Sequence, residues 1–471
     1  MMEIPIHHYP RDFLADWTYE LEFDFEREGI PASWRSGQPV VWGDEARKLE
    51  VNESVSAASF SIDEALLAVA TGKEVRVFGV DTLDLKQVLR GHTQKVRSVR
   101  FCPVSPDGGG YVLVSSSVSD NGRDGMIIIW MLDEQGKNRH EVEEPLDIED
   151  LATKVTEAAM QELVRGYGWM RDEAESDKLL EGVKEIVWRA DARHAIRDST
   201  VLYGDLAGER SCPFIDDGRS LIYITEHRAP SPGAAMAPKI VVWDMEKREE
   251  RLALEGHTDR IMWLGISPDS TTLASASWDE TLKLWDASTG QLKFDIGPSG
   301  AQLMTAAFSP DSKAIAFVNG SIIMHIYSVV DGSLISKIEI PLGFIRSLAW
   351  SPDGQSLVAG GSGIVYFWNP YTGIQEQKWQ LRSSEGVGRF RSFLETGAVQ
   401  WLDCEGKMLA FKGSEGGVNV YDTVQNQKWR SDAKRGDMTK MANPHLLYYL
   451  RSARQLVSVD SDQTVRFWSL N

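Results

Sequence analysis

The chain has 471 residues, of which 42% are hydrophobic and 25% are charged, as in soluble globular proteins. This length suits about two to four domains or one large repeat array, and no apolar run reaches the roughly 18 residues that cross a bilayer. The net charge of −19 argues against a chain that wraps nucleic acid as a whole, because that binding requires positive charge.

The N-terminus and the cysteines indicate an intracellular protein, in the cytoplasm, the nucleus or both. The first residues (MMEIPIHHYPRDFLADW) lack the basic and then apolar order of a signal peptide. Cys102, Cys212 and Cys404 lie far apart, leave an odd count and show no CxxC spacing. We therefore expect buried thiols in a reducing compartment, and neither a disulfide framework nor a zinc site.

Residues 1–50 contain eleven acidic and five basic residues, with Trp17, Trp34 and Trp42 among them. Two interpretations remain open for this acidic, tryptophan-rich segment. It is a strap that packs on the rest of the fold through its aromatics and also supplies a closing strand, or it is an arm that docks a partner.

From residue 51 to residue 471 one pattern recurs: a short apolar strand, a turn such as Ser-Pro-Asp-Gly, an alternating strand, a tight turn, and a strand that ends in an aromatic residue. Proline presets φ, aspartate caps the turn and glycine accepts positive φ, and period-2 alternation makes each unit a β-meander. The closing aromatics lie 41 to 53 residues apart, except for 113 residues between Trp130 and Trp243. The closing strands are Val75–Phe78, Ile127–Trp130, Ile240–Trp243, Leu282–Trp285, Ile323–Tyr327, Ile364–Trp368, Val418–Tyr421 and Val465–Trp468.

The unit from Gly256 to Asp286 carries the most complete pattern, with a Gly-His pair at its start, Asp279 in a tight turn and Trp-Asp at its end. It resembles the WD40-repeat family, and the resemblance implies an all-β propeller. In that family His, a strand hydroxyl, Asp and Trp form a buried hydrogen-bonded chain that fixes the blade. The residues expected to form this structural tetrad here are His257, Ser275 or Ser277, Asp279 and Trp285.

Eight closing strands predict eight blades, with seven as the alternative, because the third unit is weak around Ala229–Pro232. The sequence continues for only three residues after Trp468, so the last blade lacks its outer strand. We expect Arg47–Asn52 to supply that strand and so to close the ring and remove its edges.

The long interval after Trp130 holds an acidic insertion, residues 133–200, which is predicted to be a helical hairpin. Its two expected helices are Asp147–Arg165, with Asp147 as N-cap, and Asp172–Arg197, and Gly166 and Gly168 separate them. The apolar residues expected on their faces are Ile148, Leu151, Val155, Leu163, Leu179, Leu180, Val183, Ile186 and Val187. The hairpin packs on the outer strands of blade two or three, or it protrudes as a recognition element.

No catalytic, cofactor-binding or metal-binding set is predicted. His92 and His257 each follow glycine at the position that the repeat explains, and the glycine-rich segments do not introduce helices as phosphate loops do. We therefore expect no enzyme activity, no cofactor and no metal site.

The WD40 resemblance also implies where partners bind. Ligands of such propellers often lie on the narrow face, where the inner strand of each blade begins and where the residue before the turn aspartate lies. Among the residues at these positions six are Lys or Arg and none is acidic, although acids outnumber bases 69 to 50 in the chain. The expected partner-binding residues are Lys95, Arg97, Arg123, Arg210, Arg260, Met262, Trp278, Gln302, Met304, Phe344 and Arg346.

These observations predict a non-enzymatic scaffold or adaptor, a monomeric ring within a larger complex, whose basic narrow face binds acidic or phosphorylated segments of other proteins. The alternative is a propeller associated with RNA or ribonucleoprotein, an assembly or processing factor. A second basic area between Lys428 and Arg454 favours this alternative. No membrane partner is expected.

Overall fold

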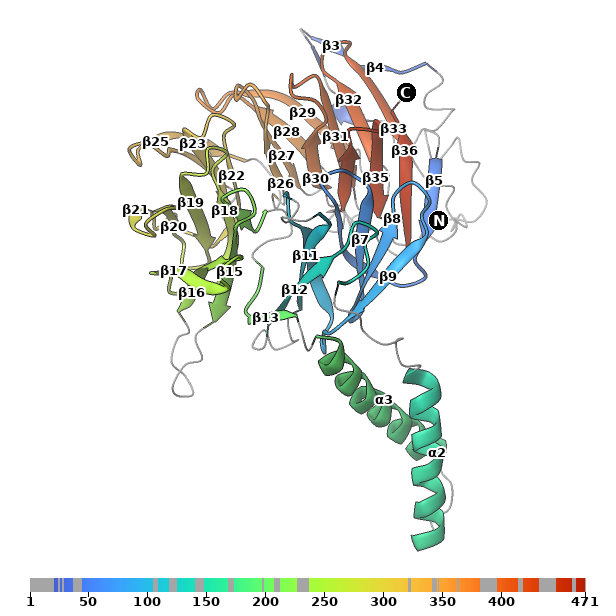
Figure 1. Ribbon diagram of the computed structural model, residues 1–471. Helices are drawn as coiled ribbons and strands as arrows, with labels where there is room; N and C mark the ends of the chain where they lie inside the picture. The colour runs from blue at the N-terminus through green and yellow to red at the C-terminus, as the bar shows by residue number, and fades with distance from the viewer. Residues whose placement is uncertain are drawn as a thin grey trace, which may run out of the picture. The chain divides into compact units, whose positions relative to one another are not determined.

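The computed structural model describes residues 21–23, 26–27, 29–36, 45–104, 109–117, 125–139, 148–167, 173–196, 199–206, 212–226, 237–320, 323–340, 345, 347–361, 364–381, 396–413, 418–431, 446–459 and 463–470. These residues form eight blades, each built on four antiparallel strands, and two of the sheets include a fifth strand (Figure 1). The prediction of an all-β propeller with eight blades is confirmed, and the alternative of seven is wrong. The chain divides into two compact units, unit 1 (Met1–Ser54 with Ala207–Asn471) and unit 2 (Val55–Leu206).

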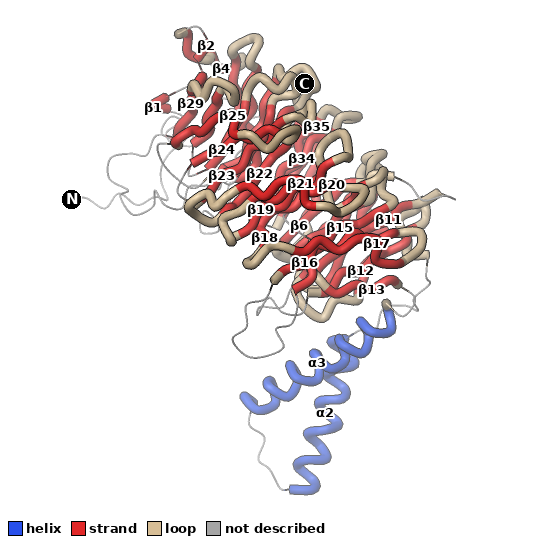
Figure 2. The backbone as a smooth tube through the Cα atoms, turned by 90° about the vertical axis from the view of Figure 1, so that its left-hand side faces the viewer, coloured by secondary structure: helices blue, strands red, loops and turns tan. Residues whose placement is uncertain are grey.

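Unit 2 consists of two blades and two helices. Blade 1 contains β6 (Val55–Phe60), β7 (Leu66–Thr71), β8 (Glu74–Gly79) and β9 (Leu85–Arg90). Blade 2 contains β10 (Val96–Phe101), β11 (Tyr111–Ser117), β12 (Met126–Leu132) and β13 (Thr200–Tyr203). The helices α2 (Ile148–Tyr167) and α3 (Glu173–Ala195) come between the third and fourth strands of blade 2 and project from the strands of unit 2 (Figure 2).

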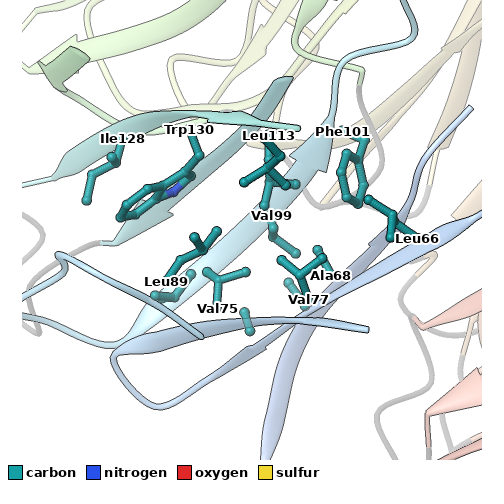
Figure 3. Packing of buried hydrophobic residues seen from close by; sticks show 14 residues of the cluster. Leu66, Ala68, Val75, Val77, Leu89, Val99, Phe101, Leu113, Ile128 and Trp130 are labelled. Atoms are coloured by element: carbon teal, nitrogen blue, oxygen red, sulfur yellow. The ribbon is translucent and has the colours of Figure 1, made fainter. Parts of the chain in front are cut away.

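The core of unit 2 lies between its two blades. Leu66, Ala68 and Val75 of blade 1 face Val99 and Trp130 of blade 2, and all are at most 3% exposed (Figure 3). Burying a Leu or Val side chain in this way contributes about 1.5–3 kcal/mol. The alternation seen in the sequence therefore serves packing between neighbouring sheets.

Unit 1 contains six blades. Blade 3 contains β14 (Phe214–Ile215), β15 (Ser220–Glu226), β16 (Pro238–Asp244) and β17 (Glu249–Glu255). Blade 4 contains β18 (Ile261–Ile266), β19 (Thr272–Ser277), β20 (Leu282–Asp286) and β21 (Leu292–Ile296). Blade 5 contains β22 (Leu303–Phe308), β23 (Ala314–Asn319), β24 (Ile323–Ser328) and β25 (Leu334–Glu339). Blade 6 contains β26 (Ser347–Trp350), β27 (Leu357–Gly361), β28 (Ile364–Trp368) and β29 (Gln375–Leu381). Blade 7 contains β30 (Thr396–Trp401), β31 (Met408–Gly413), β32 (Val418–Asp422) and β33 (Gln427–Ser431). Blade 8 contains β34 (Leu447–Leu450), β35 (Gln455–Val459), β36 (Thr464–Ser469) and a strand from the N-terminal segment.

The Ser-Pro-Asp turns join the first and second strands of blades 4 to 6 in one way. In blade 4 the Ser267 hydroxyl donates to Asp269 Oδ1 over 2.5 Å and accepts the N–H of Thr272 over 3.0 Å. The fourth turn residue then adopts positive φ, 61° at Ser270 and 70° at Gly354. The sequence signal for these turns is thus a local hydrogen-bond pattern.

The N-terminal segment adds strands to three blades of unit 1. Strand β5 (Glu45–Glu50) pairs antiparallel with β36 and supplies the fourth strand of blade 8, which is the place expected of Arg47–Asn52. Strand β1 (Leu21–Phe23) pairs antiparallel with β29, and β4 (Ser33–Trp34) pairs parallel with β33. Between them β2 (Glu26–Arg27) and β3 (Ile30–Pro31) form a small hairpin.

The helices of the insertion differ in detail from the predicted ones. Helix α2 continues through Gly166, which was expected to separate the helices, and Asp147 and Gly168 lie outside the described residues. Val155 is 43% and Ile186 68% exposed, so these two residues do not lie on a buried apolar face. Ala152 and Thr156 are buried instead, and α2 packs against α3.

Candidate interaction surface

The residues of the expected tetrad lie together in blade 4. His257 Nδ1 lies 2.7 Å from Asp279 Oδ2, and His257 Nε2 lies 2.7 Å from Ser275 Oγ. Trp285 donates its indole N–H to the same hydroxyl over 3.0 Å. Ser277 is not a member, because its hydroxyl donates to the Asp259 carbonyl and accepts the Asp279 N–H. This buried chain joins the start of the blade to its second and third strands.

Blades 2 and 8 contain parts of the same arrangement. The ring of His92 lies 2.7 Å from Ser115 Oγ and 2.9 Å from Ser117 Oγ, and Trp130 donates to Ser115 over 2.8 Å. Trp468 donates to the Ser458 hydroxyl over 2.9 Å in the same way. The corresponding turn aspartates of these blades lie outside the described residues.

Two groups of these chains have shifted pKa values. Burial opposes ionisation of Asp279, but hydrogen bonds from His257, Thr281 and the Thr258 N–H outweigh it, and the pKa of Asp279 is lowered. Burial alone lowers the pKa of His92 to about 3, so this ring is neutral near pH 7. Both groups are held by internal partners and therefore stabilise blades and do not present chemistry to a ligand.

Arg260 and Trp278 lie at the narrow end of blade 4, which we define as the end of a blade where the first strand begins. The Arg260 guanidinium carbon lies 5.8 Å from the centre of a Trp278 ring, and the backbone N–H of Trp278 donates to the Arg260 carbonyl over 2.9 Å. Arg260 is exposed and Trp278 half-buried. Trp278 Nε1 is buried and has no hydrogen-bond partner among the described residues.

The same end of blade 5 adjoins this pair. The Ser299 N–H donates to the carbonyl of Glu280 in the turn after Trp278, over 2.9 Å, so the loops of both blades meet there. Gln302 is exposed just before β22, and Met304 is half-buried on it, as Met262 is on β18. Thus five of the predicted partner-binding residues, Arg260, Met262, Trp278, Gln302 and Met304, lie at the narrow ends of two adjacent blades.

Lys95 and Arg97 are exposed at the narrow end of blade 2, in unit 2. Arg123, Arg210, Phe344 and Arg346 lie outside the described residues, so the structure does not place them. The predicted set therefore separates into a group in unit 1, a pair in unit 2 and four residues without a described position.

Sequence reasoning missed how the insertion attaches to unit 2. Trp188 of α3 donates its indole N–H to the His92 carbonyl over 2.8 Å, and Glu185 pairs with Lys73 over 2.5 Å. Asp191 lies 3.6 Å from Arg90. Among the described residues, α3 contacts β9 and the β7–β8 turn of blade 1 through polar groups, which differs from the expected packing of an apolar face on blade two or three. The sequence signal for this attachment was Trp188, a tryptophan on an otherwise acidic helix.

The described residues contain no group of three or more His, Cys, Asp or Glu side chains that could hold a metal ion. Cys102 is buried as expected, but Cys212 and Cys404 are exposed because they lie in loops before β14 and after β30. None of the three cysteines forms a disulfide in the described part of the chain. Within the described residues no helix is both long and apolar enough to span a membrane.

Comparison with known proteins identifies the repeats. The family model for the WD domain, G-beta repeat, matches residues 83–131, 248–286 and 332–369. The chain carries WD40 repeats. Each matched WD40 segment begins at the outer strand of one blade and ends at the third strand of the next, so the sequence repeat ties neighbouring blades together. Propellers built from WD40 repeats typically serve as scaffolds for protein interactions.

Two curated relatives contain a similar WD40 repeat. The chain is 42% identical over 45 residues to the guanine nucleotide-binding protein subunit beta of Lymnaea stagnalis, and 46% identical over 44 residues to the protein of the same name of Dictyostelium discoideum. These matches cover 10% and 9% of this chain and 13% of each relative. The similarity is therefore one repeat long and does not extend to the function of the relatives.

Proposed function

We propose that the protein is a non-enzymatic interaction scaffold that binds an acidic or phosphorylated segment of another protein at the narrow ends of blades 4 and 5. The observation that carries this proposal is the exposed Arg260 guanidinium stacked on Trp278. Arginine binds carboxylate and phosphate in a bidentate fork, and tryptophan is the residue type most often found to anchor a partner.

The surroundings of Arg260 and Trp278 favour a peptide segment in which an acidic residue is adjacent to an apolar one. Met262 and Met304 are half-buried at the same ends of these two blades and offer adaptable apolar contact. Asp259 is exposed and Glu280 half-buried at the same end. The positive charge is therefore local, which suits one acidic side chain better than a long polyanion.

The alternative, an RNA-associated propeller, requires a continuous basic track with stacking aromatics. The second basic area predicted between Lys428 and Arg454 does not supply it in the described residues. Lys428 is 8% exposed and its ammonium lies 4.5 Å from the centre of a Trp34 ring. Arg451 and Arg454 are exposed in the β34–β35 turn, and Lys434, Arg435 and Lys440 lie outside the described residues, so the described cations form a local pair and not a track. We therefore favour the protein segment as the ligand.

A peptide selection tests this function. A random peptide library displayed on phage is selected on the full chain, and the selected peptides are measured by fluorescence anisotropy. We expect acidic peptides with an adjacent apolar residue, whose affinity falls at least about tenfold, or about 1.4 kcal/mol, in Arg260→Glu. Their affinity also falls with rising salt.

The matched control is Lys313→Glu, because Lys313 is 75% exposed in the β22–β23 turn, at the opposite end of blade 5. The Lys313→Glu variant should bind the selected peptides as tightly as the wild type does. Selected peptides without acidic residues, or equal losses in both variants, would contradict the proposal. Binding of a labelled oligo(U) that disappears in Arg260→Glu would favour the RNA alternative.

A further inference from the structure

The outer edge of blade 7 holds an extended segment of the N-terminus. Strand β4 lies parallel to β33, and the N–H groups of Ser33 and Arg35 donate to the carbonyls of Asn426 and Lys428 over 2.9 and 3.0 Å. The Asn426 side-chain amide donates to the Ile30 carbonyl over 2.8 Å. An outer strand presents a row of unpaired backbone groups, and this segment uses some of them.

Three side chains of the segment fit specific positions on that edge. Ala32 is 6% exposed and joins a core cluster that contains Val358 of blade 6 and Val399 of blade 7. Trp34 covers the ammonium of Lys428, which lies 4.5 Å from its ring centre. Ala32 thus fills a buried position between two blades, and we refer to it as the plug.

The fourth position makes the reciprocal contact. The Arg35 guanidinium carbon lies 5.1 Å from the ring centre of Trp429, which is 8% exposed. Each cation thus stacks on the tryptophan of the other strand. By contrast, Ile30, Pro31 and Ser33 are exposed and leave their positions open to other residues.

We propose that this edge of blade 7 is a binding site for extended protein segments with the pattern small residue, any residue, Trp, Arg, and that residues 32–35 fill it in cis. Nine residues, 36–44, join Arg35 to β5. Such a short tether gives an effective concentration in the millimolar range, so a small set of contacts keeps the site filled. A partner segment binds by strand addition after it displaces residues 32–35. The site is independent of the surface around Arg260.

The test opens the site in the full chain and offers the segment in trans. The variant Ala32→Glu with Trp34→Ala removes the plug and one stacking contact, and the probe is a fluorescein-labelled peptide of residues 28–38 (EGIPASWRSGQ). We expect the opened variant to bind the probe at least about tenfold more tightly than the wild type, whose site is filled in cis. The same probe with Ala32→Glu is the matched control and should not bind.

Trp34→Ala alone serves as the milder variant where the double variant does not fold, and adding Lys428→Met to the opened variant should weaken probe binding several-fold. The proposal is overturned if a folded, opened variant does not bind the probe, or if the wild type binds it equally. Concentration-dependent dimerisation of the wild type would also overturn it, because the occupant in trans would then be a second copy of this chain.

Discussion

The Trp188 indole N–H donates to the carbonyl oxygen of His92, 2.8 Å away, and so ties helix α3 to the residue that begins the buried hydrogen-bonded chain of blade 2. The Trp188 ring also lies 5.8 Å from the Lys73 ammonium and 5.7 Å from the Arg90 guanidinium carbon. One side chain thus joins the insertion to two loops of unit 2 at the narrow end of blade 1.

Removing this anchor should release α3. Trp188→Ala loses a hydrogen bond worth about 1 kcal/mol and two cation–π contacts worth about 0.5–1 kcal/mol each. We expect amide hydrogen exchange in α3 to rise roughly tenfold or more, with little change in the strands of unit 2. Trp188→Phe keeps an aromatic ring, so its exchange rates in α3 should lie between those of the wild type and those of Trp188→Ala. Unchanged exchange in Trp188→Ala would show that other contacts hold the helix.

The insertion should be dispensable for folding only if Ile196 is kept. Ile196 packs on the core of unit 2, and a Cβ atom built on Gly91 would collide with its side chain. Replacing residues 147–195 by a short Gly/Ser linker should therefore leave a folded chain. Extending the replacement to residue 197 should lower the free energy of unfolding by about 2–3 kcal/mol in urea titrations. Equal stability of the two variants would contradict this role of Ile196.

The repeats could be predicted because their signals are local. Each closing strand named from the sequence coincides with the third strand of a blade, since alternation, Ser-Pro-Asp turns and the final aromatic recur at a regular spacing. The tetrad of blade 4 followed from spacing for the same reason, and only the choice between Ser275 and Ser277 needed coordinates.

The attachments could not be predicted, because they depend on single contacts between distant parts of the chain. Nothing in the local sequence pairs Trp34 with Lys428, or Trp188 with the carbonyl of His92. Helical periodicity likewise placed Val155 and Ile186 on apolar faces, whereas Ala152 and Thr156 are the buried residues of α2 in the described part. Periodicity reports which face is apolar and not which neighbour covers it.

Asp279 should stabilise blade 4 in a pH-dependent way. Asp279→Ala leaves the buried His257 ring and the Thr258 N–H without their acceptor, and should cost about 1–3 kcal/mol at pH 7. Because the pKa of Asp279 is lowered by folding, its contribution is complete above the unfolded pKa, about 4, and is lost as the pH falls further. Urea titrations from pH 7 to pH 3 measure the difference. If the free energies of unfolding of the wild type and Asp279→Ala differ by the same amount at every pH, Asp279 does not act in its ionised form.

His92 should make the stability of unit 2 fall in mild acid. Its folded pKa is about 3, below the unfolded value of about 6.5, so between these values the unfolded chain binds the extra proton. Stability therefore rises with pH across this window, by about 2 kcal/mol from pH 5 to pH 7 for this one group. His92→Phe should remove that part of the pH dependence, although its stability at pH 7 is lower. An unchanged slope in the variant would show that another group titrates.

Strand β5 should be required for the stability of blade 8. It pairs along β36, where Glu45 accepts a hydrogen bond from Arg466 over 2.9 Å, Arg47 stacks on Phe467 and Leu49 is 8% exposed. Deleting residues 1–52 leaves β36 as an unpaired edge, which costs its ladder of hydrogen bonds and exposes apolar surface. Deleting residues 1–44 keeps β5 and isolates the effect of the preceding segment. We expect the longer deletion to lower the Tm by about 5 °C or more relative to the shorter one. If both truncated chains melt together, β5 is not the strand on which the last blade depends.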